Sequence, residues 1–178
     1  MEEHHPDGLP ISINLSAIDF NNTSFIDNTL AIITSYDIDP SLIEIELTET
    51  VFSENLLKIN EVISKFKSHH IKIAIDDFGT GYSSFSYLQD LNIDSLKIDK
   101  SFISNIYTKP KSLAIVKSII YMGSNLGLSV IAEGIENTFE LKQLVQSGCH
   151  MGQGYLFTKP VNEKQIIEYI EAKNKNSL

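Results

Sequence analysis

The chain has 178 residues, of which 42% are hydrophobic, and its formal net charge is −9. This length and composition predict one soluble globular domain with a sizeable core. Because the net charge is negative and no cluster of Lys and Arg stands out, we expect no binding of a nucleic acid polymer through a basic surface.

Features that would direct the chain out of the cytosol are missing from its sequence. The apolar runs are all shorter than the roughly 20 residues that cross a bilayer. The first residues, Met-Glu-Glu-His-His-Pro, have neither the basic nor the apolar part of a secretory signal. A single cysteine, Cys149, excludes an internal disulfide and fits a reducing compartment. We therefore expect a cytoplasmic protein, or the cytosolic part of a membrane-tethered parent.

Short β-rich runs alternate with longer amphipathic runs along the chain. The predicted strands are residues 10–15, 43–47, 71–75, 95–99, 128–132 and 150–154, and the predicted helices are residues 24–36, 53–69, 112–126, 138–146 and 162–173. Gly127 and Gly148 each follow a helical run, as C-capping glycines do. Six alternating units predict a parallel sheet with helices packed outside it.

The predicted strands have one apolar and one partly polar face. In the second strand, for example, Ile43, Ile45 and Leu47 alternate with Glu44 and Glu46. A doubly wound sheet is buried on both faces and should read as continuous apolar runs. A solvated edge strand could explain one such pattern but not five. We therefore expect a TIM-type (β/α) barrel whose strands carry functional groups at their C-terminal ends.

Oxygen ligands gather at those strand ends. Asn14, Glu46, Asp76 and Glu133 each lie at or near the end of a predicted strand. Each alone could be a helix cap or a surface charge, but together they would repel unless cations lay between them. Oxygen ligands of this kind suit Mg²⁺, Mn²⁺ or Ca²⁺, and no His or Cys spacing suggests zinc.

Two adjacent carboxylates, Asp76 and Asp77, open a Gly-rich segment with Gly79 and Gly81. Neighbouring strand residues point in opposite directions, so both carboxylates reach one region only where the strand ends and the chain bends. Such a pair suits a site with two metals. The alternative is an Asp-rich turn with Ser83 as the N-cap of the next helix.

These residues stand in strings that resemble the EAL domain, the family of cyclic di-GMP phosphodiesterases. The strings are Ser12-Ile13-Asn14-Leu15-Ser16, Glu46-Leu47-Thr48-Glu49, Asp76-Asp77-Phe78-Gly79-Thr80-Gly81-Tyr82-Ser83-Ser84, Leu96-Lys97-Ile98-Asp99, Ala132-Glu133-Gly134-Ile135-Glu136, and Gln153-Gly154-Tyr155 with Lys159-Pro160 behind it. They follow the family's order and spacing over nearly the whole chain.

The resemblance implies a role for each matching residue. The first metal would be held by Asn14, Glu46, Asp76 and Glu133, and the second by Asp77 with Asp99 close by. Substrate binding would involve Asn14, Asp77 and Gln153, and the catalytic residues would be Lys97, Glu133, Gln153 and Glu49. Among these, Glu49 would anchor the 76–84 loop and Gln153 would position water or substrate.

Lys97 would orient or deprotonate the attacking water. Since it lies among carboxylates, its ammonium should stay protonated, and we prefer orientation and charge stabilisation. Its other interpretation is a salt bridge with Asp99 or Glu133 inside the barrel.

The resemblance also implies the reaction, which is hydrolysis of cyclic di-GMP to linear pGpG. The expected cofactor is Mg²⁺ or Mn²⁺ at a two-metal site, with inhibition by Ca²⁺. The expected partners are a second copy, as a homodimer, and N-terminal sensory or GGDEF-type domains. A third, weaker interpretation is a metal-dependent barrel phosphodiesterase that acts on a different ester.

The chain departs from the family at its beginning. The Glu-Ala-Leu string that names the family is not in the sequence, and the first strand here corresponds to about the third of the family barrel. We expect residues 1–173 to be the C-terminal portion of an EAL domain, with about six of eight βα units, followed by a polar tail at 174–178. The alternative function is a truncated or degenerate domain that binds cyclic di-GMP or a protein partner without turnover.

Overall fold

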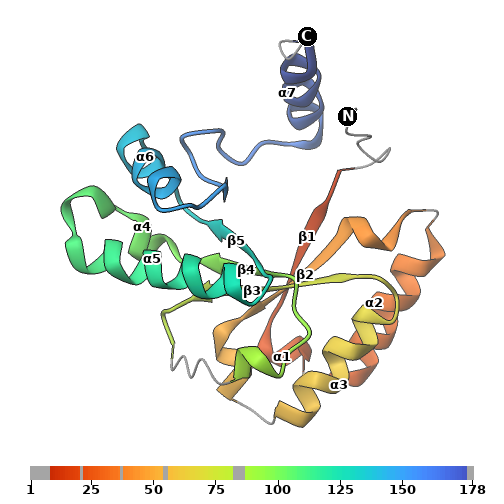
Figure 1. Ribbon diagram of the computed structural model, residues 1–178. Coiled ribbons are helices and arrows are strands. Elements are labelled where there is room, and N and C mark those ends of the chain that lie inside the picture. The colour runs from red at the N-terminus through yellow and green to blue at the C-terminus, as the bar shows by residue number, and fades with distance from the viewer. Residues whose placement is uncertain (1–8, 21, 37, 54–55, 82–86, 176–178) are drawn as a thin grey trace.

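The computed structural model describes residues 9–20, 22–36, 38–53, 56–81 and 87–175. These residues contain one sheet of six parallel strands in the order β1-β2-β3-β4-β5-β6 (Figure 1). The strands are β1 (Ile11–Leu15), β2 (Ile43–Thr48), β3 (Lys72–Phe78), β4 (Ser95–Ile98), β5 (Ser129–Ala132) and β6 (Met151–Gly152). The predicted α/β class and the six predicted strands are confirmed, although β3 runs beyond its predicted end and β6 is shorter than predicted.

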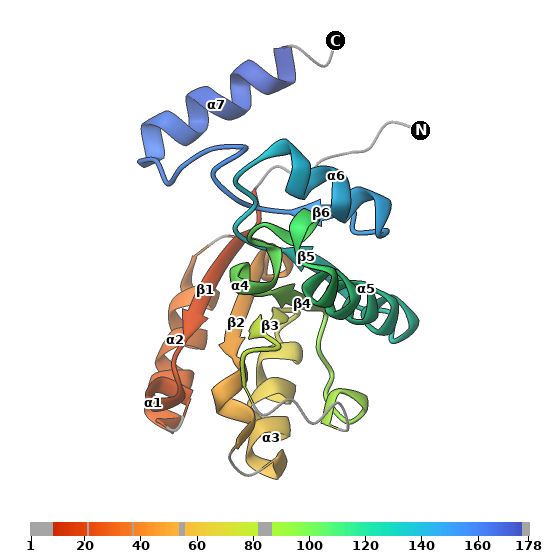
Figure 2. The ribbon, with the colours of Figure 1, turned by 90° about the vertical axis from the view of Figure 1, so that its left-hand side faces the viewer.

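Helices lie outside the sheet and connect most successive strands, while the described part of the β3–β4 connection holds only the 3₁₀ helix η3 (Tyr87–Gln89) (Figures 1 and 2). They are α1 (Ala17–Phe20), α2 (Thr23–Ser35), α3 (Leu56–Lys67), α4 (Lys100–Ile103), α5 (Pro110–Asn125), α6 (Thr138–Gln146) and α7 (Glu163–Lys175). The one-turn helices α1 and α4 escaped prediction because one turn is too short to show a helical period. Helix α7 includes Asn174 and Lys175, so the predicted tail begins as helix, and residues 176–178 lie outside the described part.

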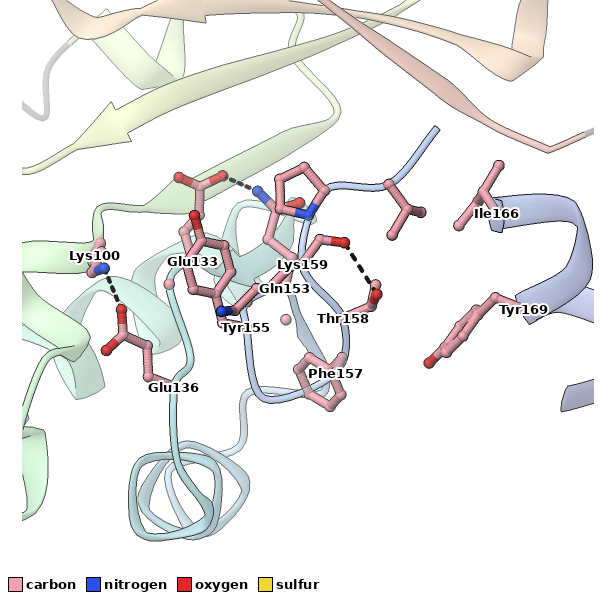
Figure 3. A pocket seen from close by; sticks show the side chains of 15 residues that line it. Lys100, Glu133, Glu136, Gln153, Tyr155, Phe157, Thr158, Lys159, Ile166 and Tyr169 are labelled. Carbon is pink, nitrogen blue, oxygen red and sulfur yellow. Dashed lines mark hydrogen bonds and ion pairs between the residues drawn. The ribbon is translucent and has the colours of Figure 1, made fainter. Parts of the chain in front are cut away.

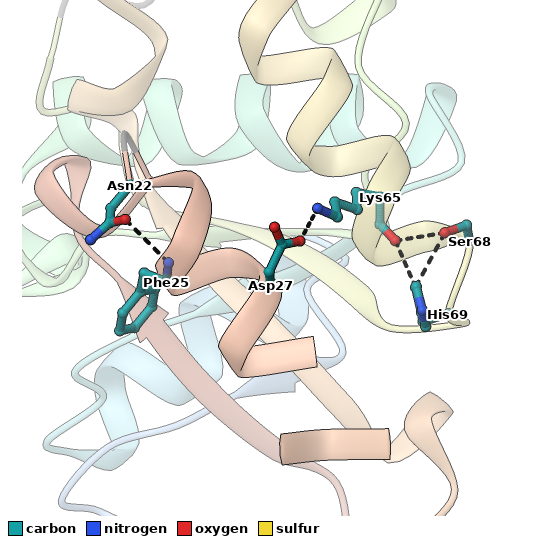
Figure 4. Close-up of polar contacts among 6 residues, drawn as sticks. All are labelled: Asn22, Phe25, Asp27, Lys65, Ser68 and His69. Atoms are coloured by element: carbon teal, nitrogen blue, oxygen red, sulfur yellow. Dashed lines mark hydrogen bonds and ion pairs between the residues drawn. The ribbon is translucent and has the colours of Figure 1, made fainter. Parts of the chain in front are cut away.

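Side-chain caps and glycines fix the helix ends. The Asn22 side chain accepts a hydrogen bond of 3.2 Å from the backbone N–H of Phe25 at the start of α2, as Figure 4 shows. An exposed ion pair between Asp27 and Lys65 joins α2 to α3 in the same figure. The predicted capping glycines Gly127 and Gly148 have φ of 76° and 86°, which are left-handed values that favour glycine.

Apolar strand side chains form the core beneath the helices. Ile43, Ile45 and Leu47 of β2 are buried, as predicted. In β1 the alternation does not lead to burial: Ile11 and Ile13 lie on the same side of the sheet as Ile43 and Ile45 but stay exposed. The physical reason is position: β1 is the outermost strand of the described sheet, so helices can cover it from one side only.

Helix α7 stands away from the sheet in both ribbon views (Figures 1 and 2). Its side chains are mostly exposed. Within the described residues, no helix is both long and apolar enough to span a membrane.

One close helix–strand contact gives a stability test. A Cβ on Gly123 of α5 would collide with Val130 of β5. We predict that Gly123→Ala lowers the free energy of unfolding by about 1–3 kcal/mol, although Ala favours helices, because overpacking outweighs helix propensity. Urea denaturation should reveal the loss. The control Ser124→Ala, at the exposed next position, should not be destabilised; an equal loss in both variants would contradict the packing argument.

Candidate metal centre

A buried ammonium lies at the centre of the site. Lys97 of β4 is 4% exposed, and its Nζ lies 2.7 Å from Glu46 Oε1, 2.7 Å from Glu133 Oε1 and 3.3 Å from Asp76 Oδ1. These side chains come from β2, from the end of β5 and from β3. Their carboxylates meet because parallel strands end at the same edge of a sheet.

Burial and the neighbouring charges both shift the pKa values of Lys97 and Glu133. Burial by itself lowers the pKa of Lys97, but hydrogen bonds to Glu133 and Glu46 and the nearby Asp76 outweigh it, so its pKa lies above the ordinary value. Lys97 is therefore protonated at neutral pH. The pKa of Glu133 is raised, first by burial and also by the charges of Asp76 and Glu46, although Lys97 opposes the shift.

A bulge turns two neighbouring carboxylates toward one place. Ile75 of β3 pairs with Leu96 of β4, yet Phe78 pairs with Ile98, so the register shifts between these positions. Within the shift, Asp77 has φ of 53°, which is unusual for a residue other than glycine. The strand therefore does not end at residue 75 as predicted. It continues to Phe78, and the bulge supplies the bend that the two carboxylates need.

Carboxylates in this cluster could hold a divalent metal. Oxygen atoms of Asp76, Asp77 and Glu133 all lie within 4.8 Å of one another. Asp76 Oδ1 is buried and accepts no hydrogen bond. Its contact with Lys97 Nζ, at 3.3 Å, is an ion pair. Burial, Asp76 and Asp99 raise the pKa of Asp77, and the charge of Lys97 opposes them without cancelling the shift. An orphaned buried oxygen among hard oxygen donors fits Mg²⁺ or Mn²⁺.

Glu49 contacts the loop after β3 and lies outside the carboxylate cluster. It begins the 3₁₀ helix η2 (Glu49–Ser53) and is buried. Its Oε2 accepts hydrogen bonds from the backbone N–H groups of Gly79, at 2.9 Å, and Gly81, at 3.1 Å. A Cβ on Gly81 would press against the Glu49 carboxylate. The contact thus explains the glycine at position 81. Residues 82–86, including the alternative cap Ser83, lie outside the described residues.

Gln153, which directly follows β6, holds the Glu133 side chain by a hydrogen bond. Its Nε2 donates a 2.6 Å hydrogen bond to Glu133 Oε1, the oxygen that also faces Lys97. The backbone keeps the two segments together, because the N–H of Gln153 donates to the carbonyl of Ala132 at 2.9 Å. Glu133 therefore has a fixed direction at the end of β5.

Two of the predicted residues lie at the margin of the cluster. Asn14 of β1 is exposed and lies beside Glu46 in the register of the sheet. Asp99 follows β4 and caps α4, where its Oδ1 accepts a 2.9 Å hydrogen bond from the backbone of Ser101. It is near enough to Asp77 to raise the pKa of that group.

A cavity of about 710 Å³ opens beside Glu133 and Gln153 (Figure 3). Its wall includes Tyr155, with Lys100 Nζ 5.9 Å and Lys159 Nζ 5.7 Å from the ring centroid. Both ammonium groups lie at a distance that suits a cation–π contact. The cavity thus places an aromatic ring and positive charge next to the carboxylates.

The sequence analysis assigned no role to three residues of this cavity wall, although Glu136 and Lys159 stand in the motif strings. Lys100 makes an ion pair with Glu136, and both line the cavity with Lys159. A signal was present, because Lys100 follows the Lys97-Ile98-Asp99 string and Glu136 ends the Glu133-Gly134-Ile135 string. Only the fold shows that the ends of these two strings meet.

Comparison with known proteins gives a consistent result. The family model described as "EAL domain" matches residues 1–160. The signalling protein YkoW of Bacillus subtilis is 43% identical over 162 residues, which are 91% of this chain and 20% of YkoW. The cyclic di-GMP phosphodiesterase PA2567 of Pseudomonas aeruginosa is 39% identical over 164 residues, 91% of this chain and 28% of that protein. The chain thus spans less than a third of either relative.

Solved structures share the fold. The EAL domain of Mycobacterium smegmatis DcpA matches with a TM-score of 0.83 at 30% identity, covering 88% of this chain and 70% of that one. The EAL enzyme Bd1971, bound to cAMP and cyclic di-GMP, matches with a TM-score of 0.86 at 37% identity, covering 90% and 43%. Klebsiella pneumoniae BlrP1, in a complex with manganese and cyclic di-GMP, matches with a TM-score of 0.79 at 30% identity, covering 85% and 39%.

The buried ammonium gives a test of the cluster's electrostatics. We predict that Lys97→Met lowers the free energy of unfolding at pH 7 by about 3–5 kcal/mol, because carboxylates lose their buried partner. The Lys97 pKa is raised in the folded protein, so its stabilising contribution is fully present below the ordinary value of 10.5, which includes pH 7.

The pH dependence identifies the cause. At pH 5 the carboxylates left without Lys97 take up protons, so Lys97→Met should lower the free energy of unfolding by less than it does at pH 7. Urea denaturation at both pH values measures it, with the exposed Lys142→Met as the matched control. A loss of the same size at both pH values would point to a packing defect and sink the electrostatic explanation.

Proposed function

Because the chain belongs to the EAL domain family, we propose that it carries a divalent-metal site for the hydrolysis of cyclic di-GMP to linear pGpG. The observation that carries this proposal is the group of strand-end carboxylates around Lys97, which includes Asp76 Oδ1, a buried oxygen that accepts no hydrogen bond. Residues 1–173 would act as the C-terminal portion of an EAL domain. The similarity to PA2567 and to structures that contain cyclic di-GMP supports the choice of substrate.

Asp76, Asp77 and Glu133 would hold metal, with Glu46 and Asn14 completing the set of oxygen ligands and Asp99 beside Asp77. Bound Mg²⁺ or Mn²⁺ would supply a water of lowered pKa and would offset charge on the phosphodiester. The manganese complex of BlrP1 supports this choice of metal. Inhibition by Ca²⁺ remains a prediction.

Lys97 would orient the attacking water and stabilise negative charge on the phosphoryl oxygens. It would not act as a general base, because its raised pKa keeps the ammonium protonated at neutral pH. A protonated amine has three N–H donors and no acceptor. Two of its close contacts are the 2.7 Å ion pairs with Glu46 and Glu133, so metal bound by those carboxylates would free donors for water or substrate.

Glu49 and Gln153 would act by positioning other groups. Glu49 holds Gly79 and Gly81, two to five residues beyond the Asp76–Asp77 pair, and so restrains the bulge that directs both carboxylates. Gln153 holds Glu133 and borders the cavity, where it can also contact substrate. Tyr155, Lys100 and Lys159 offer a ring and positive charge, which suit a nucleobase and a phosphate.

A second candidate is binding of cyclic di-GMP, or of a protein partner, without turnover. The observation that favours binding is the similarity to Bd1971, whose structure is bound to cAMP and cyclic di-GMP, at 37% identity. A homodimer, further sensory or GGDEF-type domains and a cytoplasmic location remain predictions.

An activity assay separates the two candidates. Purified protein incubated with cyclic di-GMP and Mg²⁺ or Mn²⁺ should form pGpG, followed by chromatography. We predict that Asp76→Ala reduces the rate by more than about 100-fold, because it removes a metal ligand. Asp90→Ala, at an exposed position, is the control. Binding of cyclic di-GMP without formation of pGpG would favour the second candidate, and unchanged turnover by Asp76→Ala would overturn the ligand assignment.

Metal binding has a readout independent of turnover. Mn²⁺ at about 100 times its dissociation constant should raise the free energy of unfolding by about 2.7 kcal/mol, because it binds only the folded state. A chelator should reverse the gain. Asp76→Ala should lose it and Asp90→Ala should keep it. If Mn²⁺ stabilises the wild type and Asp76→Ala equally, the ion binds elsewhere.

A further inference from the structure

Glu140 is a buried carboxylate that lies outside the carboxylate cluster. It belongs to the first turn of α6 and is 3% exposed. Its Oε1 accepts a 2.8 Å hydrogen bond from the backbone N–H of Asn105. Its Oε2 accepts hydrogen bonds from the backbone N–H groups of Glu136, at 2.9 Å, and Asn137, at 3.3 Å. One side chain therefore joins two loops that are far apart in the sequence.

Helix capping explains only one of the two Glu140 oxygens. Asn137 and Glu140 form the capping box of α6, which uses Oε2. The bond from Oε1 to Asn105 lies outside the box, because Asn105 belongs to the connection between α4 and α5. Burial by itself raises the pKa of Glu140, but hydrogen bonds from backbone N–H groups outweigh it and hold the pKa below 4.5. At neutral pH both oxygens are therefore acceptors.

The two loops that Glu140 joins both reach the cavity beside the cluster. They are residues 99–105 and residues 133–137. The loops also meet through Lys100, whose ammonium makes an ion pair with Glu136 (Figure 3). The stem of Lys100 packs against Gly134, where a Cβ would collide with it. Since Lys100 and Glu136 line the cavity, the spacing of the two loops shapes its wall.

The start and the end of the 133–137 loop are held by different contacts. At its start, the backbone N–H of Glu133 donates to the carbonyl of Ile98 at 3.1 Å, so the neighbouring strand holds it. Near its end, the backbone N–H of Glu136 donates to the Glu140 carboxylate. A change at Glu140 should therefore displace Glu136 and leave Glu133 in place.

We propose that Glu140 is a positioning residue for substrate, which fixes the spacing of the two loops and so places Lys100 and Glu136 at the cavity wall. The ion pair with Glu136 directs the Lys100 ammonium, and a directed cation suits a phosphate of a cyclic dinucleotide. This role rests on the proposed function, which supplies the substrate. Glu140 then affects substrate binding and not the chemical step, because the strands hold Lys97 and the carboxylate cluster.

The substitution Glu140→Gln separates helix capping from the link to Asn105. Gln keeps one accepting oxygen, which can serve the N–H groups of Glu136 and Asn137 as a capping box allows. Its amide NH₂ then faces the N–H of Asn105, and two donors form no hydrogen bond. With cyclic di-GMP and Mn²⁺ we expect KM to rise at least about 10-fold, which corresponds to about 1.4 kcal/mol. The value of kcat should stay within about twofold, because only uniform binding is lost.

Two further measurements do not depend on turnover. Calorimetry gives the Kd for cyclic di-GMP, which should rise as KM does if the wild type binds without hydrolysis. Hydrogen–deuterium exchange reports on the link without any ligand. In Glu140→Gln the amides of residues 99–105 should exchange at least about 10-fold faster, because their loop loses its anchor. Amides of β3, in the middle of the sheet, should not change.

Asn22→Ala is the matched control for a loss of stability alone. It removes the side-chain cap of α2, on the connection between β1 and β2. Loss of such a cap typically lowers stability by about 1 kcal/mol, which urea denaturation measures for both variants. Asn22→Ala should keep the wild-type KM and the wild-type exchange of residues 99–105.

Three results would overturn the positioning role while leaving the proposed function intact. The first is an unchanged KM and Kd in Glu140→Gln. The second is a change of KM and kcat no different from that in Asn22→Ala. The third is wild-type exchange of residues 99–105 in Glu140→Gln, since the link would then hold nothing in place. A wild type that neither binds nor hydrolyses cyclic di-GMP would instead overturn the proposed function itself, and the role for substrate with it.

Discussion

The site depends on one buried ammonium among carboxylates. Lys97 lies within 2.7 Å of both Glu46 and Glu133, and without it these groups would hold uncompensated negative charge in a protected place. The cluster also explains why the strands alternate as they do. A parallel sheet buried on both faces would need apolar side chains at these positions. Charged side chains can occupy the inner face here because the ammonium and the carboxylates neutralise one another.

The bulge in β3 turns the carboxylates of Asp76 and Asp77 toward the same place. Without the shift between Ile75 and Phe78, Asp76 and Asp77 would point to opposite faces of β3. The positive φ of Asp77 has an energetic cost of roughly 1–3 kcal/mol, and such strain persists where surrounding contacts enforce it. Glu49 provides such contacts through Gly79 and Gly81. The hydrogen bonds from Glu49 to the loop thus help to keep the strained backbone at Asp77, and with it the direction of both carboxylates.

The same sheet that assembles the site leaves an edge exposed. The carboxylate cluster is formed by β2, β3, β4 and the end of β5, in the middle of the sheet, whereas Asn14 lies on the outermost strand.

The sequence by itself determined the class of fold and, apart from the end of β3, the strands, and it predicted that carboxylates gather at their C-terminal ends. It did so because alternation of apolar and polar residues has a fixed period, and because the motif strings follow a recognisable order and spacing along the chain. It could not reveal the bulge at Asp77, since a register shift depends on the neighbouring strand. Nor could it show that Lys100 meets Glu136 or that Ile11 stays exposed. These features depend on which elements pack together across long separations in sequence, and only the tertiary structure decides that.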